Sequence, residues 1–188
     1  MTFSESETSN IISIKKFLFG RINVLFAELP IVLANYLRDN AILTGGAIPS
    51  IFHGEIPNDY DLYLSDVNHV LYFKQYITNM DQTLIQDADE KYLDVLVAGK
   101  LVTANATTFK NGLQVITLHT ADARSTFDFL HCMSWYKISD NTLHISKNQY
   151  VTIVQKILVK NEHKNAFPLS KKRVDKYVKR GWKFGKYL

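Results

Sequence analysis

Two aspartates, Asp59 and Asp61, are the residues whose type and spacing best suit chemistry, and they lie two positions apart in the run DYDLYL. The aromatic and aliphatic residues of this run predict a strand over residues 59–64. Because alternate side chains of a strand point to the same face, the two carboxylates project together, about 7 Å apart along the strand. Each carboxylate raises the pKa of the other unless a cation lies between them. Two hard oxygen ligands of this kind predict a Mg²⁺ site.

A diglycine precedes the aspartate pair. A short apolar run predicts a core strand that ends in Thr44-Gly45-Gly46, and Gly46 stands thirteen positions before Asp59. Glycine lets the backbone come close to a ligand because no Cβ intervenes. We expect the amides of Gly45 and Gly46 to hold phosphate groups. The hydroxyl of Thr44 or Ser50 would assist them. A diglycine alone also fits an ordinary turn, and Asp-x-Asp alone also occurs in glycosyltransferase-like metal sites, so the combination carries the prediction of a nucleotide site.

This order of a diglycine, a short helix and a strand bearing Asp-x-Asp resembles the signature of the polymerase-β-like nucleotidyltransferases. Residues 41–64 look most like the head of tRNA nucleotidyltransferases and poly(A) polymerases, and like small bacteriophage nucleotidyltransferases. The resemblance implies transfer of a nucleoside monophosphate from an NTP to an acceptor hydroxyl, with release of pyrophosphate. It implies Mg²⁺ as the metal, with Mn²⁺ as the alternative. The 3′ end of RNA or tRNA is the favoured acceptor; a protein, as in toxin-type relatives, or a small molecule is the alternative.

In that family a third carboxylate comes from a later strand and completes the metal site, and Asp128 is the candidate here. It lies between Phe127 and Phe129 in a strand-like run. If both phenylalanines face the core, Asp128 faces the surface that Asp59 and Asp61 share. A salt bridge to a lysine or arginine, or a plain surface position, is the alternative interpretation of Asp128.

The chain also departs from the tRNA nucleotidyltransferase pattern. Ile48-Pro49-Ser50 stands where Arg-Asp usually follows the diglycine, and there is no room for the long helical body that grips tRNA. The resemblance therefore does not imply CCA addition in the full sense.

The C-terminal end of the chain is basic. Eight lysines or arginines and one acid lie between Lys171 and Leu188, and this run resembles the basic helix that follows the head in the same family. At helical spacing four cations share one broad face, which would bind a triphosphate or an RNA backbone: Arg173, Lys176, Lys179 and Arg180. Tyr177 and Trp182 would either stack on a base or, as is more usual for aromatic residues, pack in the core. A solubilising tail is the alternative interpretation of the charge run.

Composition sets the outer limits of function. The chain has 188 residues, 46% of them hydrophobic, and a formal net charge of +4. No segment resembles a membrane span. The single cysteine, Cys132, excludes an internal disulfide and fits a reducing cytoplasm. If the protein is viral, this is the cytoplasm of the host. The histidines and Cys132 show no zinc spacing. His131, near Asp128, would assist proton transfer or, more often for a lone histidine, be a satisfied core or surface residue. The oligomeric state is left open.

The pattern predicts an α/β (α+β) fold: a mixed-sheet nucleotidyltransferase head flanked by helices over residues 1–160, and a short basic helical extension over 161–188. The ambiguous stretch 81–99 holds Asp87, Asp89 and Glu90 in an expected turn and a short helix or strand near 93–97. The expected helices cover residues 10–29, 30–38, 47–53, 67–79, 147–160 and 170–180. The expected strands cover residues 41–44, 59–64, 101–109, 113–118, 127–130, 133–137 and 143–146.

Two functions of other classes fit the same sequence. One is a non-catalytic nucleic-acid-binding protein that uses this fold as a scaffold. The other is a partner-binding regulatory subunit, such as one half of a toxin–antitoxin pair.

Overall fold

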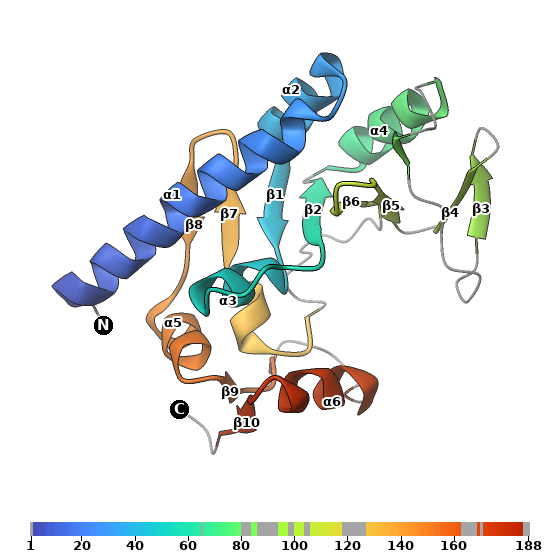
Figure 1. Ribbon diagram of the computed structural model, residues 1–188. Helices are drawn as coiled ribbons and strands as arrows, with labels where there is room; N and C mark the ends of the chain where they lie inside the picture. The colour runs from blue at the N-terminus through green and yellow to red at the C-terminus, as the bar shows by residue number, and fades with distance from the viewer. Residues whose placement is uncertain are drawn as a thin grey trace.

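A computed structural model gives the architecture of the chain (Figure 1). For residues 94–97 and 100–103 it describes the backbone alone. The structure describes residues 2–64, 66–79, 84–85, 94–97, 100–103, 106–117, 127–162, 169 and 171–185.

A mixed sheet organises the described part of the chain, in the strand order β3-β4-β5-β6-β2-β1-β7-β8. Within this sheet β1 (Ala41–Thr44) pairs antiparallel with both β2 (Tyr60–Leu64) and β7 (Trp135–Lys137). On its other side β2 runs parallel to β6 (Leu113–Ile116), with Asp61 opposite Gln114. The remaining strands are β3 (Asp94–Val97), β4 (Lys100–Thr103), β5 (Ala106–Thr108) and β8 (Thr142–His144).

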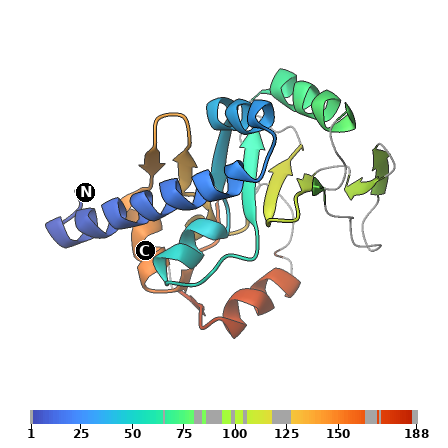
Figure 2. The ribbon, with the colours of Figure 1, turned by 45° about the horizontal axis from the view of Figure 1, so that its top comes forward.

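Long helices cover one face of this sheet. Helix α1 (Glu5–Ala27) crosses in front of β8, β7 and β1, and α2 (Ile31–Asn40) follows it (Figures 1 and 2). The apolar stripe of α1 packs on the strands in the main core and is made by Ile14, Leu18, Ile22, Leu25 and Phe26. Helix α4 (Val67–Asn79) follows β2 and lies beyond the end of that strand at Leu64 (Figure 1). These elements confirm the predicted α+β class.

The remaining elements gather where β1 ends and β2 begins. β1 leads through the diglycine into α3 (Ala47–Phe52), which contacts the 3-10 helix η3 (Leu130–Met133) and α5 (Lys147–Val154). Both views place α6 (Lys171–Lys179) at this end of the molecule (Figures 1 and 2). The chain then returns as β10 (Lys183–Phe184), which pairs parallel with β9 (Ile157–Leu158).

A second, smaller core holds α6 against the rest of the fold. It consists of Phe129, Cys132, Leu158, Tyr177 and Trp182. Tyr177 and Trp182 are therefore core residues, which is the more usual of the two roles considered for them. The division of the chain at residue 160 stays a prediction.

The structure corrects several predicted boundaries. Helix α1 begins at Glu5, not at residue 10, because Ser4 and Glu7 form a capping box that satisfies its first amides. Helix α2 continues to Asn40, two residues beyond its predicted end at residue 38. Helix α5 ends at Val154 instead of residue 160, because Lys156 adopts a φ of +53° that an α-helix cannot continue.

Two predicted strands are also wrong. Residues 127–130 do not form a strand: Phe129 makes an isolated bridge with Lys160, and the chain then turns into η3. The single strand expected over 101–109 is divided into β4 and β5. The predicted turn that contains Asp87, Asp89 and Glu90 lies outside the described residues.

Candidate active site

The two aspartates of the first motif differ in their surroundings. Asp59 directly precedes β2 and is exposed, whereas Asp61 is the second residue of the strand and is partly buried. Asp61 Oδ1 is buried and has no hydrogen-bond partner among the described residues. A buried carboxylate oxygen without a partner is costly, so it suits a position that a cation fills.

The diglycine lies against Asp61. Gly45 has a φ of +92°, and a methyl group added there would stand 3.2 Å from Asp61 Oδ2. The Gly45 amide donates to Cys132 O at 3.1 Å, which fixes the corner between β1 and α3. Glycine is therefore required at this position both by its backbone conformation and by the closeness of the carboxylate.

Electrostatics single out Asp61 as well. Burial, and then the negative charge of Asp59, raise its pKa from 3.8 to about 7, and the positive charge of Lys176 opposes this shift. The free carboxyl group is thus half protonated near neutral pH. A divalent cation beside it would favour the ionised form.

Asp128 lies on the same side of the molecule as Asp59 and Asp61, but it already has a cationic partner. Its side chain is 1% exposed and forms an ion pair with Arg173, whose side chain is 52% exposed. The backbone of Asp128 is fixed, because its carbonyl accepts from the Asn161 amide at 2.9 Å. The salt bridge considered as the alternative for Asp128 is therefore present.

Two adjoining cavities flank α6. We call them the inner and the outer cavity; Asp59 and Lys176 line both. The inner cavity, of about 710 Å³, is lined by residues that include Gly45, Asp59, Asp61, Asp128, Arg173 and Lys176. The outer cavity, of about 790 Å³, is lined by residues that include Ser50, Glu55, Asp59, Lys176, Lys179 and Arg180.

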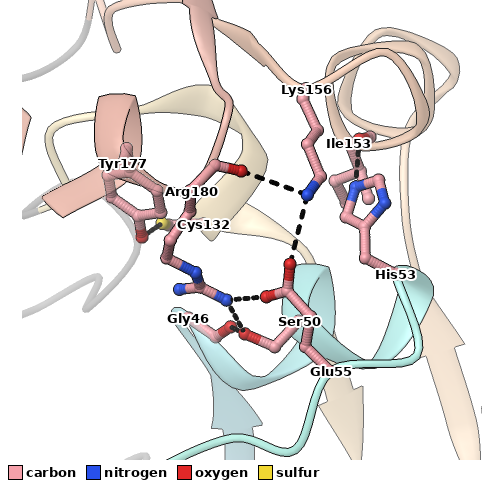
Figure 3. A network of polar contacts seen from close by, with 9 residues as sticks. All are labelled: Gly46, Ser50, His53, Glu55, Cys132, Ile153, Lys156, Tyr177 and Arg180. Atoms are coloured by element: carbon pink, nitrogen blue, oxygen red, sulfur yellow. Dashed lines mark hydrogen bonds and ion pairs between the residues drawn. The ribbon is translucent and has the colours of Figure 1, made fainter.

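Ser50, Glu55 and Arg180, which line the outer cavity, belong to one polar network (Figure 3). Arg180 donates to Ser50 Oγ at 2.8 Å and forms an ion pair with Glu55. Lys156 Nζ binds Glu55 Oε1 at 3.1 Å and Arg180 O at 3.2 Å. Burial acts to raise the pKa of Glu55, but the hydrogen bonds from Arg180 and Lys156 outweigh it and hold the pKa below its usual value.

Comparison with protein families decides the identity of the chain at family level. The model described as "Gad2: Gabija anti-defense 2 family protein" matches residues 13–156. The chain belongs to the Gabija anti-defense 2 (Gad2) family. The matched region contains the diglycine and all three aspartates and ends before α6. No curated protein matches this Gad2-family chain.

Two solved structures are among those similar to it. One, "The structure of CCA-adding enzyme apo form I", has a TM-score of 0.41 and 13% identity over 73% of this chain and 35% of that one. The other, "Thermotoga maritima CCA-adding enzyme complexed with tRNA_CCA", has a TM-score of 0.42 and 12% identity over 74% of this chain and 35% of that one. The Gad2-family chain thus spans about a third of the length of each.

The structure places most of the predicted site residues together. The three aspartates, the diglycine, Arg173 and Lys176 line the inner cavity, and Ser50, Lys179 and Arg180 line the outer one. Within the described ranges, however, no three His, Cys, Asp or Glu side chains converge closely enough to hold one metal ion. The three carboxylates thus line one cavity without converging on a single point, and Asp128 is paired with Arg173.

Two predicted residues lie elsewhere. Thr44 is fully buried, and its hydroxyl donates to Cys132 O at 3.2 Å and to Ser134 O at 2.8 Å. We therefore leave Thr44 out of the proposed phosphate site. His131 stacks between Phe129 and Trp182 in the second core, and its two ring nitrogens have no hydrogen-bond partner among the described residues.

Sequence reasoning missed the side chains that complete the cavity walls. Glu55 is a lone acid in the loop before Asp59, and Tyr63 and Gln114 come from β2 and β6. None of them belongs to a motif. The position of Tyr63, two residues after Asp61 on the same strand face, was the one available signal.

No helix in the described part of the chain is both long enough and apolar enough to span a membrane.

Proposed function

We propose that the chain is a Mg²⁺-dependent nucleotidyltransferase that transfers a nucleoside monophosphate from an NTP to an acceptor hydroxyl and releases pyrophosphate. The 3′ end of an RNA or tRNA remains the favoured acceptor, in the cytoplasm of a bacterial host. We further propose that this transfer serves the role named in the family description, which is to counteract the Gabija defence. The observation that carries the proposal is the buried Oδ1 of Asp61, which has no hydrogen-bond partner among the described residues, while Oδ2 of the same carboxylate lies against Gly45.

The residues fit a divalent metal. Asp59 and Asp61 would hold the ion, since carboxylate oxygens are the ligands that Mg²⁺ prefers, with Mn²⁺ as the alternative. The ion would neutralise charge on the phosphates and lower the pKa of the acceptor hydroxyl. Asp128 would join the set once its ion pair with Arg173 opens.

The chain itself supplies positioning and charge. Gly46 leaves space for the close approach of a phosphate, because it carries no Cβ, whereas the amide of Gly45 is bonded to Cys132 O and its missing Cβ makes room for Asp61. Lys176, which lines both cavities, would neutralise phosphate charge on either side of the carboxylates. Phosphoryl transfer needs mainly such positioning and charge stabilisation, and little covalent work from the protein.

The test is to incubate the purified chain with each α-³²P-labelled NTP, Mg²⁺ and total RNA. Labelled RNA together with released pyrophosphate is the expected result. Asp59→Asn and Asp61→Asn should abolish labelling while the fold stays intact by circular dichroism. Asp39→Asn is the matched control, because Asp39 is exposed in α2 and lies outside both cavities. A labelled protein or a labelled small molecule would identify the alternative acceptors.

A second candidate is a non-catalytic protein that binds nucleic acid or a protein partner through the same surface. The Asp128–Arg173 pair favours it, because one of the proposed metal ligands is occupied by a side chain. This candidate predicts RNA binding, or a stable complex on purification, that needs no Mg²⁺ and survives Asp59→Asn and Asp61→Asn. Binding without label transfer from any NTP would decide in its favour.

A further inference from the structure

The ion pair between Arg173 and Asp128 is asymmetric. The side chain of Asp128 is 1% exposed, whereas the side chain of Arg173, which comes from α6, is 52% exposed. Backbone and side chain of Asn161 fix the chain around the carboxylate: its amide donates to Asp128 O and its Nδ2 to Phe127 O at 3.0 Å. Asp128 is therefore the fixed partner, and Arg173 is the partner that can leave.

The same helix presents a second cation to the second carboxylate of the cavity. Lys176 follows Arg173 by three residues, so both side chains lie on one side of α6, and the charge of Lys176 acts on Asp61. A buried carboxylate needs a neighbouring cation, because desolvation of an unpaired charge is expensive. In the chain without ligands Arg173 fills that need at Asp128.

Two cations cannot share Asp128 without repelling each other at close range. A divalent ion that binds Asp128 therefore competes with the guanidinium for the carboxylate, and a guanidinium that leaves needs another anion. Phosphate is a suitable one, since arginine binds it in the same forked geometry as a carboxylate. Such a group would lie close by, because Arg173 and Asp128 line the inner cavity together with Gly45 and Gly46.

We propose that Arg173 couples metal binding to nucleotide binding: it neutralises Asp128 in the free chain and passes to the phosphates of the nucleotide, which opens Asp128 to the metal. This inference rests on the proposed function. Arg173 acts here as a nucleotide-binding residue that also controls whether Asp128 is open to the metal. Without nucleotide the chain binds divalent metal weakly, and without metal Asp128 competes with the nucleotide for Arg173. Couplings of this kind are reciprocal and typically amount to about 5- to 150-fold in affinity.

The experiment measures the affinity of the chain for Mn²⁺ and its affinity for a nucleotide analogue. If Arg173 were merely structural, its replacement would not change these two affinities in opposite directions. Mn²⁺ binding is titrated calorimetrically without nucleotide, and binding of α,β-methylene-ATP is titrated in EDTA. Arg173→Gln should bind Mn²⁺ at least about 5-fold more tightly than the unchanged chain, and the nucleotide analogue about 10-fold more weakly. Arg173→Lys, which keeps the charge, should restore the weak Mn²⁺ binding. Lys183→Gln is the control for lost charge, because Lys183 is exposed in β10, outside both cavities; it should leave both affinities unchanged.

A second variant tests the other half of the exchange. Asp128→Asn frees Arg173 from its carboxylate, so it should tighten metal-free binding of the nucleotide analogue several-fold. Mn²⁺ affinity of Arg173→Gln equal to or below that of the unchanged chain overturns the proposal, and so does failure of every variant to bind Mn²⁺. NMP transfer by the unchanged chain is measured in parallel. Transfer without the opposite shifts rejects the coupling alone, and the opposite shifts without transfer support the coupling and reject the proposed function.

Discussion

Replacing Asp61 by asparagine should stabilise the metal-free chain, although it should abolish activity. Burial, followed by the charge of Asp59, raises the pKa of Asp61 from 3.8 to about 7. Between these pH values the folded chain holds a proton that the unfolded chain has released, so the free energy of unfolding falls as the pH rises. At about 1.4 kcal/mol for each of about three pH units, the cost is about 4 kcal/mol. This destabilisation is complete above pH 7 and absent below pH 3.8. Asparagine does not ionise, so the Asp61→Asn chain is free of it.

The assay is urea unfolding in EDTA at pH 4 and pH 8. At pH 8 the free energy of unfolding of Asp61→Asn should exceed that of the unchanged chain by about 4 kcal/mol, and at pH 4 the difference should nearly vanish. Asp59→Asn is the matched control: Asp59 is exposed, so its removal relieves only the repulsion and gives a smaller gain. Adding Mg²⁺ at pH 8 should stabilise the unchanged chain but not Asp61→Asn.

One result would refute this reasoning. If Asp61→Asn were no more stable than the unchanged chain at pH 8 in EDTA, the buried Oδ1 of Asp61 would not be an uncompensated charge. The argument that Asp61 is poised for a cation would then lose its physical basis.

Three further outcomes can be checked by unfolding experiments. Gly45→Ala should lower the free energy of unfolding by about 1–3 kcal/mol and reduce transfer, because it combines a φ of +92° with a methyl group 3.2 Å from Asp61 Oδ2. His131→Phe should resist acid better than the unchanged chain: burial, followed by the charge of Arg180, lowers the pKa of His131 from 6.5 to about 3, so only the unfolded state takes up its proton between these values. The advantage should be about 2 kcal/mol at pH 5 and absent above pH 7. A double-mutant cycle of Glu55→Gln and Arg180→Gln should give a coupling of about 1 kcal/mol that falls with added salt, because both side chains are partly exposed.

The elements around the first motif were largely predictable from sequence. β1 has the predicted bounds 41–44, and β2 begins one residue later than predicted, at Tyr60. The helix after Gly46 and the end of α6 before Gly181, whose φ is +83°, also follow local rules for glycine and helix termini. These features depend on residues that are neighbours in the sequence, and this is why a single sequence is enough to place them.

The surroundings of Asp128 were not predictable in the same way. Three residues, Phe127 to Phe129, cannot distinguish a strand from an extended segment that makes one bridge with the distant Lys160. The amphipathic pattern of α6 predicted a basic face, but not that Arg173 on it would reach back to Asp128. That contact depends on the docking of Tyr177 in the second core, a tertiary event with no signal in local spacing.

The buried polar atoms that have no hydrogen-bond partner among the described residues all lie against this docked C-terminal segment. They are Asp61 Oδ1, close to the charge of Lys176, and the two ring nitrogens of His131, packed on Tyr177 and Trp182. Each such atom costs about 1–3 kcal/mol, whereas the aromatic contacts of Tyr177 and Trp182 supply the opposing gain. Two opposing contributions therefore decide how stably α6 docks. Burial of the aromatic side chains stabilises the docked helix, and the buried polar atoms without a partner destabilise it. A cation at Asp61 would reduce the second contribution without disturbing the aromatic core that holds the helix in place.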